Sequence, residues 1–264
     1  MTGFRERLQQ IIDEYSADSV LIYQMGKVGS TSLEVSLINA RHFHTLYSNH
    51  PCKVHDTRRR KHPVSWVLKL FGNALKRALI RRRGRVKIIS LVREPYGRNV
   101  SMFFQDLPLW MSEYQDVVRF DSRNEGPEFL FEAFENAYDH FYFDRWFDRE
   151  LKRLTGIDIF EHPFDKERGY EVIRRGKYEV LLLKLEKLEK AHEAIEAFVG
   201  YRFDMQDANR GERKWYACLY DDFKKKYRPS EAHLTKLYLT KTVRHFYSEE
   251  EVAGYLRRYL ERPS

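Results

Sequence analysis

The sequence predicts a three-layer α/β fold, in which helices flank a central parallel sheet of about four or five strands. Short apolar runs of strand length alternate along the chain with longer segments whose apolar residues recur at helical spacing. The clearest strand is Val86–Val92 (VKIISLV), which is rich in β-branched residues. A chain of 264 residues can bury one substantial core. Because no linker and no internal repeat is evident, one domain over residues 1–264 is expected.

The elements follow one another in strand and helix order. The residues up to Tyr15 mix charged and apolar side chains, as an amphipathic helix does and a signal peptide does not. Strands are expected at Ser19–Met25, His42–Tyr47, Val86–Val92 and Glu179–Leu185. Helices are expected at Thr31–Ala40, from Pro95 through Phe104, at Phe129–Leu154 and at Leu188–Phe198. The alternating charges of Lys184–Lys190 (KLEKLEK) are typical of an exposed surface.

The segment from residue 52 to residue 85 is strongly basic, with fourteen Lys, Arg and His residues against one acid, Asp56. Within it, Pro63–Ile80 carries apolar residues at helical spacing and is followed by four arginines. This pattern predicts an inserted basic amphipathic helix. Two interpretations stay open: a surface helix that packs on the core with a solvated basic face, or a docking element for an anionic acceptor or lipid headgroups.

The overall composition restricts the partners. A formal net charge of +8, from 47 Lys and Arg against 39 Asp and Glu, favours nucleotides, nucleic acid, anionic glycans or membrane surfaces without choosing among them. The chain has no run of about 18 uncharged apolar residues, so no transmembrane helix is expected. Cys52 and Cys218 form neither a disulfide framework nor a metal-ligand pattern. The expectation is a cytoplasmic protein without a metal, whose basic segment is a candidate for peripheral membrane contact.

The first motif is Gln24–Ser32 (QMGKVGSTS), which lies between a predicted strand and a predicted helix. Glycines let the backbone turn sharply and approach a ligand closely. The N–H groups that open the helix would then face an anion, beside the charge of Lys27 and three hydroxyls, those of Ser30, Thr31 and Ser32. This P-loop-like arrangement suits a nucleotide 5'-phosphate, although a Walker A loop places its Lys directly before the Ser or Thr. A strand-to-helix turn capped by Ser or Thr would give the same pattern.

The second motif is Val92–Ser101 (VREPYGRNVS). Arg93 comes where a strand ends, and Ser101 follows eight residues later, inside the next helix. A guanidinium and a hydroxyl so placed can converge on a phosphate beside the carboxyl end of the strand, where ligands of α/β proteins bind. Taken alone, the same residues suit an Arg that caps a helix or pairs with Glu94.

Together, the two motifs resemble those of the PAPS-dependent sulfotransferases, which transfer a sulfuryl group from 3'-phosphoadenosine-5'-phosphosulfate (PAPS) to a hydroxyl. In that family a Lys-x-Gly-[Ser/Thr]-Thr loop holds the 5'-phosphosulfate. An Arg-[Asp/Glu]-Pro segment, with a Ser eight residues after the Arg, binds the 3'-phosphate. The resemblance assigns Arg93 and Ser101 to the 3'-phosphate, and it assigns the 5' side to Lys27, Val28, Gly29, Ser30, Thr31 and Ser32.

A weaker resemblance lies in the C-terminal half. Residues 213–216 (RKWY) look like the Asn-Lys-Trp-Tyr-Ser signature of bacterial capsular polysaccharide synthesis proteins. The chain departs from that signature with Arg213 in place of Asn and Ala217 in place of Ser. The segment Lys241–Leu256 is also similar to the C-terminal region of that group. The resemblance implies a capsular or cell-surface glycan as the acceptor.

Sulfuryl transfer needs stabilisation of the leaving phosphate and a base for the attacking hydroxyl. Lys27 is the candidate for the first role. For the second, His42-Phe43-His44 resembles the His-x-His of glycosaminoglycan 2-O-sulfotransferases, in which the second His is the base. That resemblance assigns His44 as the base, while two partly buried histidines with only hydrogen-bonding roles would fit the strand as well. Other candidates for the base are His50, His55, Glu94 and Glu34.

Three other functions stay open: a P-loop-type kinase, a non-catalytic binder of nucleic acid or an anionic polymer, and a PAPS-binding protein without turnover. Against the kinase, Val28 follows Lys27, and Arg93 stands where an acidic strand end is needed. No part of the basic segment matches a named nucleic-acid module. The aromatic residues of Phe103–Trp110 and Phe129–Trp146 fit either a sugar cleft or a packed core.

Overall fold

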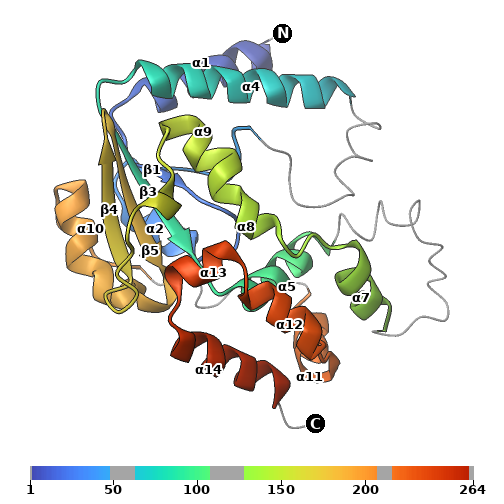
Figure 1. The fold of residues 1–264 in the computed structure, drawn as a ribbon. Coiled ribbons are helices and arrows are strands. Elements are labelled where there is room, and N and C mark those ends of the chain that lie inside the picture. The colour runs from blue at the N-terminus through green and yellow to red at the C-terminus, as the bar shows by residue number, and fades with distance from the viewer. Residues whose placement is uncertain (1, 48–62, 108–127, 207–215, 262–264) are drawn as a thin grey trace. The chain divides into compact units, whose positions relative to one another are not determined.

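The computed structural model describes residues 2–47, 63–107, 128–206 and 216–261, and the chain divides into two compact units (Figure 1). The sheet unit consists of Met1–Asn49, His62–Arg93 and Arg145–Arg210. The helical unit consists of His50–Lys61, Glu94–Asp144 and Gly211–Ser264. The single domain expected from the sequence stays a prediction.

The sheet unit contains a five-stranded, mostly parallel sheet, which confirms the predicted α/β class. In space the strands follow the order β2-β1-β3-β5-β4, and β4 alone runs antiparallel to its neighbour. The strands are β1 (Leu21–Tyr23), β2 (Arg41–Phe43), β3 (Val86–Val92), β4 (Tyr170–Arg175) and β5 (Tyr178–Lys184).

Differences in burial explain which strands could be predicted from the sequence. Almost every residue of β3 and β5 is buried, as expected for parallel strands that are covered on both faces. The antiparallel strand β4 was not predicted, because its residues are mostly half-buried or exposed and it lies at the sheet edge. A two-residue turn with Gly176 at φ 56° connects β4 to β5, and glycine is favoured at such a position.

The helices of the sheet unit are α1 (Thr2–Ser16), α2 (Ser30–Ser36), α4 (Pro63–Arg82), α9 (Lys152–Thr155) and α10 (His192–Val199). The unit also has the π-helical turn η3 (Phe147–Leu151) and the 3₁₀ turns η4 (Ile159–Glu161) and η5 (Leu185–Ala191). The first 82 residues thus contain the predicted amphipathic N-terminal helix and the described part of the predicted basic helix. No helix in the described ranges is both long and apolar enough to cross a membrane.

Several predicted boundaries were wrong. The helix expected at Thr31–Ala40 ends at Ser36, and the strand expected at His42–Tyr47 ends at Phe43. The helix expected at Phe129–Leu154 is interrupted at residues 138–141, because Tyr138 adopts an extended conformation after a π-helical turn. The segment Leu188–Phe198 begins in η5 before it becomes α-helical.

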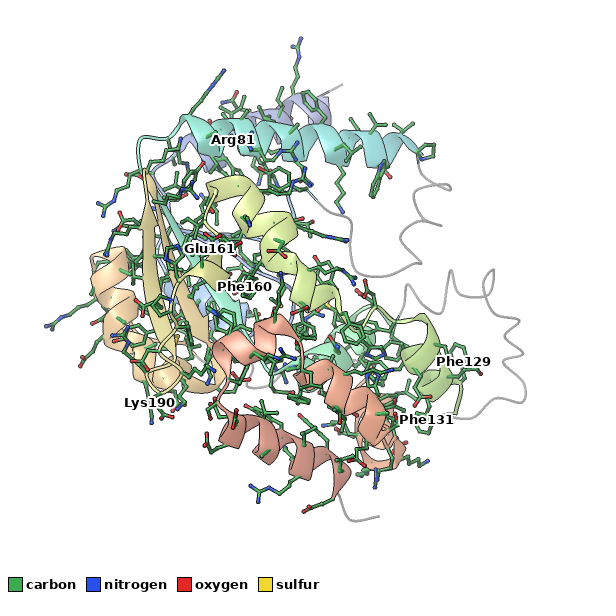
Figure 2. The ribbon with its side chains drawn as sticks, viewed as in Figure 1. Arg81, Phe129, Phe131, Phe160, Glu161 and Lys190 are labelled. Atoms are coloured by element: carbon green, nitrogen blue, oxygen red, sulfur yellow. The ribbon has the colours of Figure 1, made fainter. Side chains whose placement is uncertain are left out.

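The helical unit is built around aromatic side chains. Phe103, Phe104 and Phe134 are fully buried, and the ring centroids of Phe103 and Phe134 are 5.3 Å apart. The ring of Phe131 (Figure 2) lies 5.3 Å from that of the buried Phe223. These aromatic residues therefore form a core and not a sugar cleft.

The helical unit contains the helices α5 (Pro95–Gln105), α7 (Glu128–Glu132), α11 (Ala217–Lys226), α12 (Glu231–Tyr238), α13 (Lys241–Phe246) and α14 (Glu249–Leu260), and the π-helical turn η2 (Ala133–Ala137). The boundary between the two units falls within α8 (Tyr142–Trp146).

Glu94 fixes three elements of the helical unit. Its carboxylate accepts a 2.6 Å hydrogen bond from the backbone N–H of Gly97, so it caps the N-terminus of α5. The same carboxylate accepts hydrogen bonds from the hydroxyls of Tyr238 on α12, at 2.7 Å, and Tyr259 on α14, at 2.8 Å. Burial, followed by the charge of Glu94, raises the pKa of Tyr238. A buried carboxylate with these partners has a structural role, which argues against Glu94 as the base.

His140 makes the stability of the helical unit depend on pH. Burial, helped by the nearby His233, lowers the pKa of His140 from 6.5 to about 3. Its Nε2 lies 2.7 Å from the carbonyl oxygen of Phe134, and the ring centroids of the two histidines are 4.3 Å apart. The unfolded chain therefore binds a proton below about pH 6.5 that the folded chain does not bind.

Because the unfolded state binds the extra proton, stability is lost as the pH falls. We expect the His140 contribution to lower the free energy of unfolding by about 2 kcal/mol between pH 7 and pH 5. Urea denaturation at both pH values measures this change. The variant His140→Gln should show a smaller loss, and an equal loss in the two proteins would contradict the assignment.

Candidate functional site

The candidate site lies at the carboxyl edge of the sheet. Because β1, β2, β3 and β5 are parallel, the residues that follow them meet at that edge. They are the loop after β1, His44 after β2, Arg93 after β3 and Leu185 after β5. All of these residues belong to the sheet unit, so this unit alone brings together most of the predicted site.

The loop between β1 and α2 has an unusual backbone. Lys27 has φ 68° and Gly29 has φ 83°, so both lie in the left-handed region. A non-glycine residue rarely adopts that region, and such strain is often found at functional sites. A Cβ atom added to Gly29 would also contact the side chain of Leu185, so the positive φ and this contact together favour glycine at this position. The helix α2 has seven residues, so anion binding here would depend on loop N–H groups and nearby cations more than on a helix dipole.

The structure places the predicted 5'-phosphate residues with different exposures. Lys27 and Gly29 are half-buried, while Val28 is fully buried. Thr31 is exposed and Ser32 is half-buried in the first turn of α2. Ser30 begins that helix.

Arg93 connects the loop to the end of β3. Its Nη1 donates a 3.3 Å hydrogen bond to the carbonyl oxygen of Lys27. A second connection comes from Gln24, whose Oε1 accepts a 3.3 Å hydrogen bond from the backbone N–H of Leu91. The side chain of Gln24 is fully buried, and its Nε2 has no hydrogen-bond partner within the described residues. The loop of the first motif and Arg93 of the second motif thus meet at one end of the sheet.

Ser101 belongs to the helical unit, since the units divide the second motif between Arg93 and Glu94. It lies on α5, half-buried, with its hydroxyl oxygen 3.5 Å from the hydroxyl oxygen of Tyr220. Its predicted role beside Arg93 in binding a 3'-phosphate stays a prediction.

The two histidines of the His-x-His segment contact each other, with ring centroids 4.5 Å apart. His44 Nδ1 lies 3.0 Å from the carbonyl oxygen of Gln24. A carbonyl only accepts, so Nδ1 carries the proton, and in the neutral ring Nε2 keeps the lone pair that a general base needs. His42 Nδ1 instead lies 2.9 Å from the carboxylate of Glu34. Burial lowers the pKa of His42, and Glu34 opposes that shift.

Sequence reasoning missed the residues that hold the His44 segment in place. Trp146 Nε1 donates a 2.9 Å hydrogen bond to the carbonyl oxygen of His44. The fully buried Glu150 accepts hydrogen bonds from the backbone N–H groups of Leu46, at 2.6 Å, and Tyr47, at 3.1 Å. It also accepts from the hydroxyl of Tyr23 on β1. The carboxylate thus ties the chain after His44 to the central sheet, in contacts more than a hundred residues apart that no local pattern could reveal.

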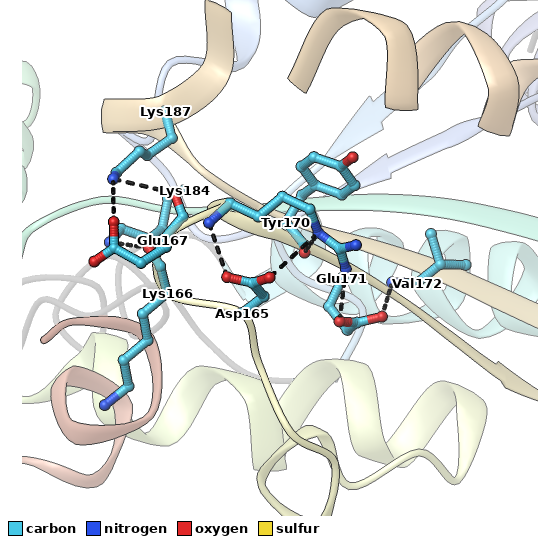
Figure 3. A network of polar contacts seen from close by, with 9 residues as sticks. Asp165, Lys166, Glu167, Tyr170, Glu171, Val172, Lys184 and Lys187 are labelled. Carbon is cyan, nitrogen blue, oxygen red and sulfur yellow. Dashed lines mark hydrogen bonds and ion pairs between the residues drawn. The ribbon is translucent and has the colours of Figure 1, made fainter. Parts of the chain in front are cut away.

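Lys184 was predicted to be exposed, and this was wrong. It is the last residue of β5, it pairs in register with Val92, and it is fully buried. Its Nζ donates a 3.3 Å hydrogen bond to the carbonyl oxygen of Lys166. The residues around it form the polar network of Figure 3, in which Lys187 donates to the carbonyl oxygen of Glu167 at 3.1 Å. The predicted strand Glu179–Leu185 includes Lys184, but the burial of its side chain depends on contacts such as that with Lys166, which leave no local sequence pattern.

The remaining predicted candidates fall into two groups. Glu34 is paired with His42, and Glu94 has the structural role described above. His50, His55 and residues 213–215 lie outside the described residues. Within the described part of the chain, no group of three or more metal-ligating side chains is placed to hold a metal ion.

The fold and site together define an α/β protein with a candidate anion site at the carboxyl edge of its sheet. Comparison with protein families shows that residues 119–248 match the model of the family described as "Putative capsular polysaccharide synthesis protein". The matched region includes β4 and β5 and most of the helical unit, and it does not include the β1–α2 loop, Arg93 or Ser101. Comparisons with curated proteins and with solved structures give no match.

Gly29 offers a direct test of the loop geometry. Gly29→Ala should lower the free energy of unfolding by about 2–4 kcal/mol, because it adds left-handed strain and a contact with Leu185. Gly200→Ala is the matched control, since Gly200 has φ 94° and nothing lies within 4 Å of an added Cβ. This control should cost only the strain, about 1–2 kcal/mol. Equal losses in chemical denaturation would show that Leu185 does not restrict Gly29.

Proposed function

We propose that this protein is a PAPS-dependent sulfotransferase that transfers a sulfuryl group to a hydroxyl of a carbohydrate. The observation that carries the proposal is the meeting of the β1–α2 loop and Arg93 at the carboxyl edge of the sheet, where the Arg93 guanidinium donates to the Lys27 carbonyl. This pairing of a left-handed loop with a strand-end arginine joins the two motifs that resemble the sulfotransferase family.

The residues suit a nucleotide that carries phosphates at both its 3' and 5' positions. For the 5' side, the loop supplies backbone N–H groups and the Lys27 ammonium. Gln24, which precedes the loop, has a buried Nε2 with no hydrogen-bond partner among the described residues. Arg93 supplies a guanidinium for the 3'-phosphate, with Ser101 as its expected neighbour. Lys27 would stabilise the charge that develops on the leaving phosphate, so the proposal invokes no metal.

His44 is the proposed general base. The acceptor oxygen forms a bond to sulfur as the bond from sulfur to the phosphate oxygen breaks, and the hydroxyl proton passes to His44 Nε2. The products are a sulfate ester and adenosine 3',5'-bisphosphate. Nδ1 of His44 is held by the Gln24 carbonyl, which fixes the tautomer and the ring for this role. Glu150 and Trp146 act as positioning residues, because they hold the backbone around His44.

The identity of the acceptor is the least specific part of the proposal. The family matched by residues 119–248 is described by capsular polysaccharide synthesis, which supports a role connected with glycans. A capsular or cell-surface glycan precursor is therefore the first acceptor to test. Tyr216, the described residue of the signature, is buried with its ring centroid 5.9 Å from that of Phe104, so in this chain it supports the core of the helical unit.

Arg93→Ala separates two roles of the guanidinium. If Arg93 binds the 3'-phosphate, its loss should weaken binding of adenosine 3',5'-bisphosphate by about 2–5 kcal/mol and leave binding of 5'-AMP nearly unchanged. If Arg93 only braces the Lys27 loop, both ligands should lose affinity together. Calorimetric titration of the variant with the two ligands distinguishes these outcomes, and unchanged affinity for both would remove Arg93 from the site.

His44→Ala should preserve affinity for adenosine 3',5'-bisphosphate and lower the rate of sulfuryl transfer by about 10²–10⁴-fold, the usual contribution of a general base. His42→Ala is the matched comparison on the same segment. Transfer of labelled sulfate from PAPS to a glycan acceptor gives the rate. Full activity in His44→Ala together with a large loss in His42→Ala would move the base to His42.

A further inference from the structure

The helix α4 carries an unusual number of exposed apolar side chains. Of the ten large apolar side chains that are exposed among the described residues, five lie on this one helix. Their exposed fractions range from 48% to 71%, for Val64, Val67, Leu68, Leu70 and Phe71. Scattered exposed apolar residues need no explanation, whereas a contiguous group on one element indicates an interaction surface.

Four of these residues share one face of the helix. Val64, Val67, Leu68 and Phe71 follow the i, i+3, i+4, i+7 spacing that places side chains along one stripe. We call this stripe the α4 face. Two of its residues, Leu68 and Phe71, line a groove of about 350 Å³ between α1 and α4, together with Leu8, Ile11 and Leu75.

The fold of the sheet unit uses other sides of α4. Ile80 is fully buried, and Arg77 donates to the carbonyl oxygen of Leu46. The helix α1 packs along α4 (Figure 1), where an added Cβ on Gly72 would lie 3.8 Å from Cδ1 of Ile11. The α4 face nevertheless stays largely exposed, and of its residues Leu68 and Phe71 also line the groove beside α1.

The charge of α4 indicates what the face would contact. The helix contains no acidic residue and five basic ones, of which Lys69, Arg81 (Figure 2) and Arg82 are exposed, whereas Lys76 and Arg77 are half-buried against other residues of the sheet unit. The chain just before it adds Lys53, Arg58, Arg59, Arg60 and Lys61 against Asp56. On the neighbouring α1, Arg5 and Arg7 are roughly balanced by three acids, Glu6, Asp13 and Glu14.

We propose that the α4 face docks the protein on the surface of a bilayer with anionic headgroups. Peripheral membrane binding combines two contributions. Apolar side chains enter the membrane interface, and neighbouring lysines and arginines contact the anionic headgroups. The helix lies on the membrane and does not cross it, consistent with its five charges. A second copy of the chain is disfavoured as the occupant, because pairing two such faces would bring two sets of cations together.

The preceding basic segment is also disfavoured as a cover. Between residues 48 and 62 the sequence offers few apolar side chains, chiefly Val54 and Cys52, to bury four large residues. The inference concerns a surface and does not depend on the proposed chemistry.

Vesicle sedimentation tests the proposal with the full chain. Wild-type protein should bind vesicles of phosphatidylserine and phosphatidylcholine, and binding should fall at least tenfold on vesicles of phosphatidylcholine alone or at high salt. The double variant Val67→Glu/Phe71→Glu should lose at least tenfold in binding to the anionic vesicles. Leu239→Glu, at an apolar residue that is 55% exposed in the turn after α12, is the control and should bind like the wild type.

Three results would overturn the proposal. The first is equal vesicle binding by the wild type and the α4 double variant, with both folded by circular dichroism. The second is a wild-type dimer in analytical ultracentrifugation that the double variant converts to a monomer, because the face would then bind a second copy. The third is binding to a soluble anionic polysaccharide as strong as to anionic vesicles and unaffected by the double variant.

Discussion

Parallel pairing of β1, β2, β3 and β5 is the constraint on which the candidate site depends. Parallel strands place all their carboxyl ends at one edge, so segments far apart in the sequence must meet there. This is why the loop containing Lys27, the His44 segment and Arg93 lie together although they come from three different strands. The hydrogen bond from Arg93 to the Lys27 carbonyl then fixes two of these segments relative to each other.

Buried charges hold together the elements within each unit. Glu150 holds the chain after His44 on the sheet, Lys184 lies buried at the end of β5, and Glu94 joins three helices of the helical unit. A buried charge is costly unless it is well hydrogen-bonded, so each one strongly favours a single arrangement of its partners. In the sheet unit the Gln24 carbonyl holds Nδ1 of His44, and Trp146 holds the backbone carbonyl of His44, so the ring is preorganised for the proposed role of general base.

The sequence could predict the parts of the fold that depend on local patterns. We could predict β3 and β5 because strands buried on both faces have continuous apolar runs. We could predict the loop after β1 because a sharp turn favours glycine. The edge strand β4 was missed because it is only partly buried, and the break near Tyr138 was missed because a π-helical turn has no clear sequence pattern. The roles of Glu150 and Lys184 depend on contacts between distant segments, and no spacing rule contains that information. The tautomer of His44 likewise could not be predicted from the sequence, because it depends on the Gln24 carbonyl beside Nδ1.

The central claim is that the carboxyl edge of the sheet binds a nucleotide that carries phosphates on both its 3' and 5' positions. The most direct measurement is calorimetric titration of the wild-type protein, without metal, with adenosine 3',5'-bisphosphate, 5'-AMP and ATP. The account predicts clear binding of the bisphosphate and markedly weaker binding of the other two, because neither has a 3'-phosphate for Arg93. Absence of bisphosphate binding, or a preference for ATP that requires Mg²⁺, would contradict the account and favour a kinase.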